Sequence, residues 1–254
     1  MKITILGCGT SGGVPRVGGL WGHCDPKNPK NRRRRVSILV EHRATRVLVD
    51  TSPDLREQLL DAEVDWLDAV LYTHEHADHC HGIDDLRGIA HNMKARIPLY
   101  AGARTMALLQ HRFDYIFQMR DGYPPIARDH IITPGKMLHL GGIDCMPFLL
   151  DHGPIDSMGF RFGNVAYTTD FNAIPAAAAP HLEGLDLWII DALRYDPHPT
   201  HPHLEQSLAW IAQFQPKHAI LTHMNWELDY ETLRTQLPTG VEPGYDGMTV
   251  TVDG

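Results

Sequence analysis

The sequence has few cysteines and no long apolar segment. Its four cysteines, Cys8, Cys24, Cys80 and Cys145, are scattered and form no C-x-x-C pair, so neither a disulfide framework nor a cysteine zinc site is indicated. No apolar run reaches the roughly 18 residues that a membrane-spanning helix needs. Residues 1–6 begin a strand pattern at once, without the cleavage site of a signal peptide. We therefore expect a cytoplasmic protein with no membrane partner.

Positive charge is also scarce. The chain has 23 lysines and arginines against 31 aspartates and glutamates, which gives a formal net charge of −8. Because nucleic-acid binding depends on basic surface, this balance argues against DNA or RNA as a partner. The length of 254 residues and the 43% of hydrophobic residues fit one catalytic domain over residues 1–254. Histidine, in contrast, occurs 17 times, and imidazole serves metal binding and proton transfer.

One histidine-rich stretch organises the chain. Residues 73–79 read T-H-E-H-A-D-H and follow the apolar run 69–72, which predicts a buried strand. Imidazole and carboxylate ligands suit zinc and similar divalent ions, and two adjacent ions need several such groups on one rigid loop. The stretch supplies four candidates, His74, His76, Asp78 and His79. A histidine-rich surface loop is the alternative, but this spacing favours a two-metal site.

The T-H-x-H-x-D-H pattern resembles the metal-binding signature of the metallo-β-lactamase superfamily. The resemblance implies that one histidine, one aspartate and one further histidine follow at later strand ends. Residues of these types stand in that order after predicted strands. The implied ligands are His74, His76 and His152 for one ion, Asp78, His79 and His223 for the other, and Asp170 between them.

Two further aspartates stand at predicted strand ends. Asp191 ends the strand 187–191 and is a rival to Asp170, which we prefer because the preceding Y-T-T run matches the family pattern. Asp50 follows the strand 46–49. It is expected either to hydrogen-bond a ligating imidazole or to cap the helix predicted over 54–61.

The order of strands and helices, together with the resemblance, predicts an α/β fold. We expect an αββα sandwich with two central mixed sheets, helices outside and the metals at one edge between the sheets. Residues 7–12 match G-x-G-x-x-G but continue as a loop, so a dinucleotide fingerprint is not indicated. A glycine-rich turn close to the metal site is the better interpretation.

Further motifs resemble the PhnP-like phosphodiesterases, relatives of the tRNA 3′-processing endonucleases of the RNase Z type. They are G-C-G-T-S-G-G-V-P at 7–15, W-G-x-C at 21–24, G-I-D-D-L-R at 82–87 and T-H-M-N at 222–225. The resemblance implies a binuclear hydrolase that cleaves small or cyclic phosphodiesters by attack of a metal-bridging hydroxide. Asp78 and His201 would be catalytic, with His201 assisting phosphate binding or leaving-group protonation.

Cofactor and substrate contacts follow from the same residues. We expect two divalent ions per chain, Zn²⁺ or Mn²⁺. Family members carry an additional zinc bound by early cysteines and by a later histidine, but here those places hold a lone Cys24 and Trp226. We therefore predict no third, structural zinc, with apolar packing around Trp21 and Trp226 in its place.

The run 32–35 consists of four arginines, which either face solvent or reach an anionic substrate. We assign Arg35, Arg87 and His203 as candidate substrate contacts, and we expect the segment 121–125 to lie over the site. Two alternatives stay open: a tRNA 3′-processing nuclease, for which the chain lacks a basic arm, and a thioester or lactone hydrolase. The resemblance also implies a homodimer.

Overall fold

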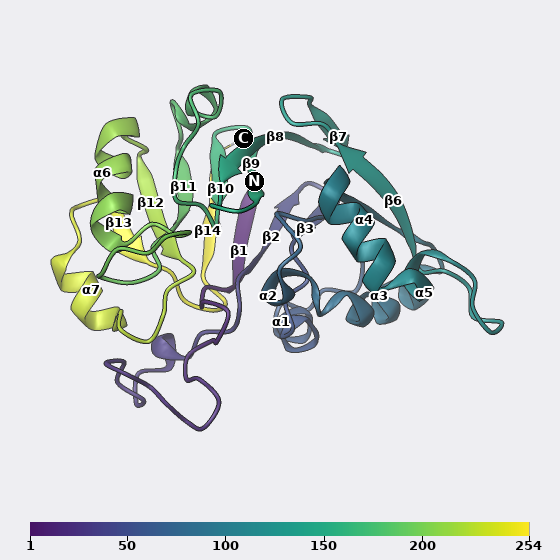
Figure 1. The fold of residues 1–254 in the computed structure, drawn as a ribbon, viewed down its shortest axis with the longest axis horizontal. Coiled ribbons are helices and arrows are strands. Elements are labelled where there is room, and N and C mark those ends of the chain that lie inside the picture. Colours follow the sequence, from purple (N-terminus) through teal and green to yellow (C-terminus); the bar gives the residue numbers. More distant parts are fainter. Residues whose placement is uncertain (254) are drawn as a thin grey trace.

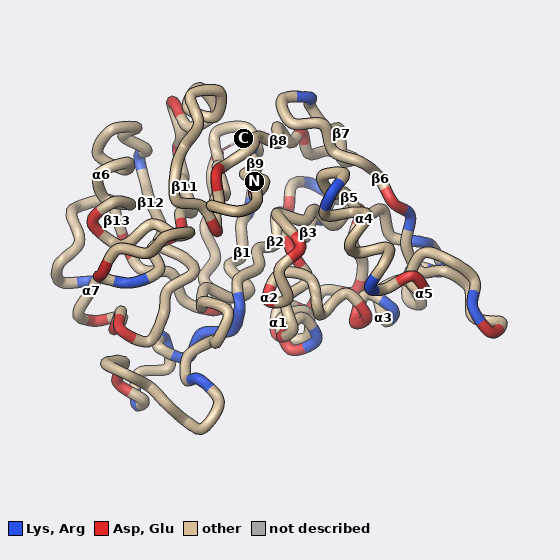
Figure 2. Tube along the Cα trace, viewed as in Figure 1, with Lys and Arg blue, Asp and Glu red and all other residues tan. Residues whose placement is uncertain are grey.

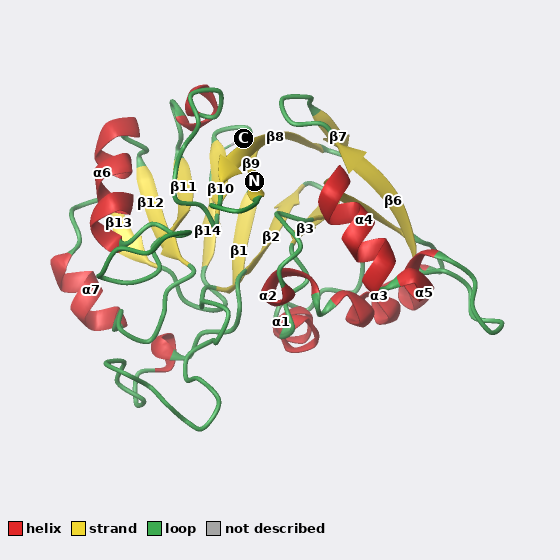
Figure 3. Ribbon diagram, viewed as in Figure 1, coloured by secondary structure: helices red, strands yellow, loops and turns green. Residues whose placement is uncertain are grey.

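The computed structural model describes residues 1–253, which form two stacked β-sheets with helices on their outer faces (Figures 1 and 3). Within these residues each sheet has seven strands, and each mixes parallel and antiparallel neighbours. The αββα sandwich predicted from the sequence is therefore confirmed.

The strands follow one another across each sheet in an order that differs from the chain order. The first sheet consists of β14 (Thr249–Thr251), β1 (Lys2–Gly7), β2 (Ser37–His42), β3 (Thr45–Val49), β4 (Ala69–Leu71), β5 (Ile97–Gly102) and β6 (Ala127–Ile132). The second consists of β13 (Val241–Pro243), β12 (His218–Thr222), β11 (Leu187–Asp191), β10 (Val165–Thr168), β9 (Asp156–Phe162), β8 (Ile143–Asp151) and β7 (Leu138–Leu140).

Helices cover both outer faces (Figure 1). Those against the first sheet are α1 (Leu55–Asp61), α2 (Ala77–Cys80), α3 (Leu86–Met93), α4 (Ala103–Arg112) and α5 (Asp114–Phe117), and those against the second are α6 (Leu204–Phe214) and α7 (Tyr230–Gln236). Short 3₁₀ turns form at Pro29–Asn31, Ile83–Asp85 and Ala179–Leu182. In the part of the chain described, no helix is both long and apolar enough to cross a bilayer.

Alternate residues of a strand contribute to different apolar layers, one between the two sheets and one under the helices. Ile38 and Val40 of β2 belong to the core between the sheets, whereas Leu39 between them belongs to the cluster under the helices. Successive side chains of a strand point to opposite faces, and each buried aliphatic side chain stabilises the fold by about 1.5–3 kcal/mol. The apolar strands read from the sequence are therefore buried on both faces.

The ends of the parallel strands define one functional edge. Strands β3 and β4 run parallel in the first sheet, as do β10, β11 and β12 in the second. Just after β3, β10 and β12, Asp50, Asp170 and His223 adopt left-handed backbones with φ of 64°, 54° and 55°. This conformation costs a non-glycine residue on the order of 1–3 kcal/mol and concentrates at functional sites.

Phe113, with a φ of −130°, separates α4 from α5. One local prediction was wrong. The segment 121–125 does not lie over the predicted ligands, because Tyr123, Pro124 and Pro125 line a hollow against α3. In Figure 1 this loop projects from the end of the molecule far from α6 and β12.

Candidate metal centre

The loop after β4 is fixed by an aspartate from the neighbouring strand. Asp50 accepts hydrogen bonds from the backbone N–H of Thr73 and from its Oγ1, both at 2.8 Å. Its Oδ2 also lies 2.8 Å from His79 Nδ1. The predicted hydrogen bond between an imidazole and the accepting Asp50 carboxylate is thus confirmed, and it directs His79 Nε2 away from Asp50.

Three histidines converge on one point. His74 Nε2 lies 2.9 Å from His76 Nδ1, which in turn lies 3.4 Å from His152 Nε2. His74 and His152 are buried, whereas the side chain of His76 is exposed. His152 comes from the end of β8, so the second sheet completes a group begun by the first.

A second group of nitrogen and oxygen atoms lies next to the first. Asp78 Oδ2 is 3.4 Å from His79 Nε2 and 3.7 Å from His223 Nε2. Asp170 Oδ1 is 3.2 Å and 3.5 Å from the same two nitrogens. The two groups therefore have the memberships expected from the sequence.

Asp170 stands between the groups. Its Oδ2 lies 3.8 Å from His74 Nε2 and from His152 Nε2, while its Oδ1 faces the second group. The backbone N–H of Asp170 donates to Asp191 Oδ2 at 2.9 Å. One carboxylate can thus contribute an oxygen to each of two adjacent cations.

The residues present fit two divalent cations. Among the residues described, His79 Nε2 and His223 Nε2 are buried without a hydrogen-bond partner, and such atoms are rare unless they have a function. Neutral imidazole nitrogens and carboxylate oxygens suit Zn²⁺ and Mn²⁺. Binding of ions by these seven residues stays a prediction.

Electrostatics favour positive charge at this position. Burial lowers the pKa of His223, but Asp170, Asp191 and Asp78 outweigh it and raise that pKa to about 9. Burial likewise opposes protonation of His79, yet Asp170, Asp78 and Asp50 raise its pKa well above the usual value. The same carboxylates would attract metal cations, which compete with these protons.

A model of the β-lactamase superfamily domain matches residues 45–224 of this chain. The chain belongs to the metallo-β-lactamase superfamily. A crystal structure of a diphosphatase from the PhnP family matches with a TM-score of 0.90 and 38% identity, over 98% of this chain and 96% of that one. The resemblance to the PhnP-like branch is confirmed by this match.

The chain also resembles longer proteins. It is 34% identical to an octanoyltransferase of Porphyromonas gingivalis over 100% of its own length and 52% of that protein. It is 30% identical to a ribonuclease Z of Bradyrhizobium sp. strain ORS 278, over 53% of this chain and 46% of the relative. The chain thus spans about half the length of these curated relatives.

A further histidine of this site faces Asp170. His201 Nε2 lies 3.8 Å from Asp170 Oδ2, and its ring stacks on His223 with centroids 4.8 Å apart. On the other side, His201 Nδ1 lies 3.0 Å from Asp191 Oδ2. His203 immediately precedes α6, and its carbonyl accepts a hydrogen bond from the backbone N–H of Ser207. Substrate contact by His203 stays a prediction.

Asp191, the rival ligand candidate, accepts hydrogen bonds from residues of the site. Its Oδ2 accepts from His201 and from the Asp170 backbone, and its Oδ1 lies 3.7 Å from His223 Nδ1. Asp191, Asp170, His201 and His223 also form a group close enough to hold a cation. The hydrogen bonds favour a role for Asp191 in orienting its neighbours.

The arginine run serves several structural purposes. Arg33 is buried and donates to the carbonyls of Asn225 and Leu228 at 3.0 and 2.6 Å, while its Nη1 lies 3.9 Å from Cys24 Sγ. A guanidinium therefore joins the early loop to the segment after His223.

The predicted apolar packing around Trp21 and Trp226 was wrong. The Trp226 ring instead faces Arg16, whose guanidinium carbon is 4.0 Å from the ring centroid. Arg32 lies over the Trp21 ring, with 5.9 Å between the guanidinium carbon and the ring centroid. Cationic side chains therefore cover both indole rings.

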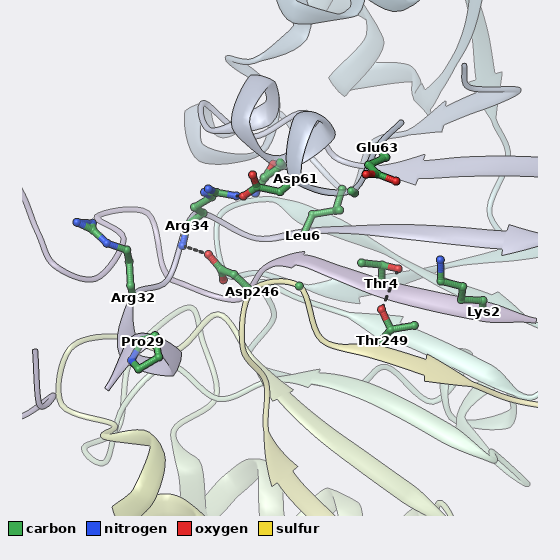
Figure 4. Close-up of a pocket in the computed structure, with 13 residues that line it drawn as sticks. Lys2, Thr4, Leu6, Pro29, Arg32, Arg34, Asp61, Glu63, Asp246 and Thr249 are labelled. Atoms are coloured by element: carbon green, nitrogen blue, oxygen red, sulfur yellow. Dashed lines mark hydrogen bonds and ion pairs between the residues drawn. The ribbon is translucent and has the colours of Figure 1, made fainter. Parts of the chain in front are cut away.

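The other arginines contact acids outside the two ligand groups. Arg35 pairs with Asp54 at 3.1 Å. Arg34 pairs with Asp61 at 2.7 Å, and its backbone N–H donates to Asp246; Figure 4 shows these side chains around a hollow of about 400 Å³ beside β1. Arg87 pairs with Asp84 at 3.1 Å. These contacts lend no support to substrate binding by Arg35 or Arg87, which stays a prediction.

Sequence reasoning missed one set of residues beside the ligands. Glu75, between His74 and His76 in the chain, is buried and contacts Arg104 and Thr105 of α4. Its position between two candidate ligands could have indicated a role at the site. No sequence pattern links Glu75 to its partners, which lie about 30 residues further along the chain.

Proposed function

We propose that this metallo-β-lactamase superfamily hydrolase is a phosphodiesterase that acts on small linear or cyclic phosphodiesters. The observation that carries the proposal is the position of His201, between Asp191 and Asp170. Two divalent ions held by the seven predicted ligands would withdraw charge from a phosphate group and activate water. The oxygen that leaves the phosphorus still requires a proton.

His201 can supply that proton. Asp191 Oδ2 accepts a hydrogen bond from His201 Nδ1, which fixes the orientation of the imidazole ring. Nε2 then points to the side of Asp170 where the scissile group would bind. The His201 side chain is 12% exposed, so a substrate can reach it while little water surrounds it.

The space beside the ligands supports a small substrate. A hollow of about 380 Å³ is lined by Glu75 and Gly153, direct chain neighbours of His74, His76 and His152. This volume is at the lower end of those of small-molecule sites. The leaving group of a phosphodiester would occupy it, next to the exposed guanidinium of Arg104.

The similarity to a PhnP-family diphosphatase supports phosphate chemistry. A tRNA-processing function has weaker support, because the ribonuclease Z match covers only 53% of this chain and the net charge is −8. Acyl hydrolysis is a second candidate, since the whole chain is 34% identical to about half of an octanoyltransferase. The single domain, the homodimer, the cytoplasmic location and the absence of a third zinc stay predictions.

A substrate panel tests the proposal. Protein loaded with Zn²⁺ or Mn²⁺ is assayed in parallel with bis-p-nitrophenyl phosphate, a 2′,3′-cyclic nucleotide, a dinucleoside diphosphate, an octanoyl thioester and a β-lactam. We expect the two phosphodiesters to be cleaved with the highest kcat/KM. Preferential cleavage of the thioester would instead establish acyl hydrolysis, and preferential cleavage of the diphosphate would move the substrate class to that of the diphosphatase relative.

A further inference from the structure

A second concave surface lies between α3 and the segment 120–126. Within residues 1–253 it consists of two hollows of about 380 and 360 Å³ that share Arg87, His91 and Tyr123. We call this combined surface the α3 hollow. Its described lining contains none of the seven predicted metal ligands. It is therefore a separate surface from the metal centre.

Basic side chains dominate this lining. Arg87, Lys94, Arg96 and Arg120 face the α3 hollow, and Asp121 is the acid among its described lining residues. Figure 2 shows lysine and arginine positions at α3 and in the loop after α5. Because the whole chain carries a net charge of −8, this local excess of positive charge marks a place where an anion is favoured.

The four cations differ in how they are held. Arg87 pairs with Asp84 at 3.1 Å and Arg120 with Asp114 at 2.8 Å, which orients their guanidinium groups. In the described part of the chain, Lys94 and Arg96 form no ion pair. These two exposed side chains are thus available for a charged ligand, and a guanidinium matches the geometry of phosphate.

Aromatic surface adjoins the cations. Tyr115 and Tyr123 line the α3 hollow, and Tyr123 is 71% exposed. The neighbouring Pro124 and the buried Ala90 and Ile126 make the rest of the lining apolar. An exposed aromatic ring beside cations is a stacking surface for a planar base whose phosphate contacts the basic groups.

We propose that the α3 hollow binds a nucleoside phosphate independently of the metal centre, with the base against Tyr123 and the phosphate on Lys94 and Arg96. The combined volume fits a ligand of that size. Arg87, expected from the sequence to contact an anionic substrate, contributes to this second site. The proposal does not depend on which bond the metal centre cleaves.

Binding is tested on the full chain after removal of metals with a chelator. Adenosine 5′-monophosphate, inorganic phosphate and adenosine are titrated separately by isothermal calorimetry at low ionic strength. We expect saturable binding of the nucleotide, weaker binding of phosphate and the weakest binding of adenosine. Absence of saturable nucleotide binding, or binding seen only after metals are restored, would overturn the proposal.

Surface variants locate the site. Lys94→Ala combined with Arg96→Ala should raise the Kd of the nucleotide at least about tenfold, because charge-assisted contacts are lost. Tyr123→Ala should weaken nucleotide binding but leave phosphate binding unchanged. Lys27→Ala combined with Lys136→Ala, two exposed lysines elsewhere, is the matched control. Equal Kd values for all variants would place the ligand on another surface, and unchanged phosphodiesterase activity separates this result from the function of the metal centre.

Discussion

The Glu75 carboxylate accepts a hydrogen bond from Arg104 Nε at 2.8 Å, although the two residues are 29 positions apart. Its other oxygen accepts from Thr105 Oγ1 at 3.0 Å, and its carbonyl accepts from Arg112 at 2.6 Å. Three side chains of α4 therefore hold the centre of the loop that carries four predicted ligands. Glu75 is a positioning residue for that loop.

Glu75→Gln should weaken metal binding. The amide can still accept a hydrogen bond from Thr105, but it loses the charge pairing with Arg104, and partners that support metal ligands typically contribute 10–100-fold to affinity. Competition with a fluorescent Zn²⁺ chelator measures the change, and Glu57→Gln on the exposed surface of α1 is the matched control. If both variants bind Zn²⁺ as the natural chain does, Glu75 does not position the ligands.

His201→Ala should lower kcat by about 10²–10⁴ if His201 is the general acid. Asp191→Asn should cause a smaller decrease, because the amide oxygen can still accept the hydrogen bond that orients the His201 ring. Phosphodiesterase assays with metal analysis measure both effects, and the exposed His139→Ala serves as control. Unchanged kcat at full metal content would remove His201 from the reaction.

Chelation should destabilise the folded chain. The predicted ligands come from loops of both sheets, so ions bind the folded state and not the unfolded one. At a free Zn²⁺ concentration 100 times Kd, the expected gain in unfolding free energy is about 2.7 kcal/mol. Thermal unfolding with and without EDTA tests this. Asp170→Ala should reduce the gain, and equal stabilisation of both proteins would show that the ions bind elsewhere.

Stability should fall as pH rises from about 4 to 7 because of Asp246. Burial raises the pKa of its carboxyl to about 7, against the hydrogen bonds from the backbone of Arg34 and Cys8. The folded state holds this proton more tightly than the unfolded state. The stabilising contribution is therefore present below the pKa of the unfolded state and is lost as pH rises to the pKa of the folded state, with a slope of up to about 1.4 kcal/mol per pH unit. Urea unfolding at several pH values should show a shallower decrease for Asp246→Asn. Parallel curves for the two proteins would contradict the assignment.

The sequence could place the candidate ligands because the groups that contain them follow buried apolar strands, where local pattern and motif agree. His152, Asp170 and His223 could be placed this way. The edge strand β6 could not be predicted. Four of its six residues are exposed, so its sequence does not alternate between buried apolar and exposed polar residues. The structural role of Arg33 could not be predicted either, since its partners Asn225 and Leu228 are more than 190 residues away in the sequence. Only the folded chain brings such residues together.

Asp50, Asp170 and His223 share left-handed backbones at the ends of their strands. Glycine adopts this conformation without steric cost, so folding considered alone would favour glycine at all three positions. The side chains of Asp50, Asp170 and His223 are therefore explained by their chemistry, since their backbone conformation costs free energy. A chain freed from its catalytic task would be expected to drift toward glycine or asparagine there, becoming more stable as it becomes inactive.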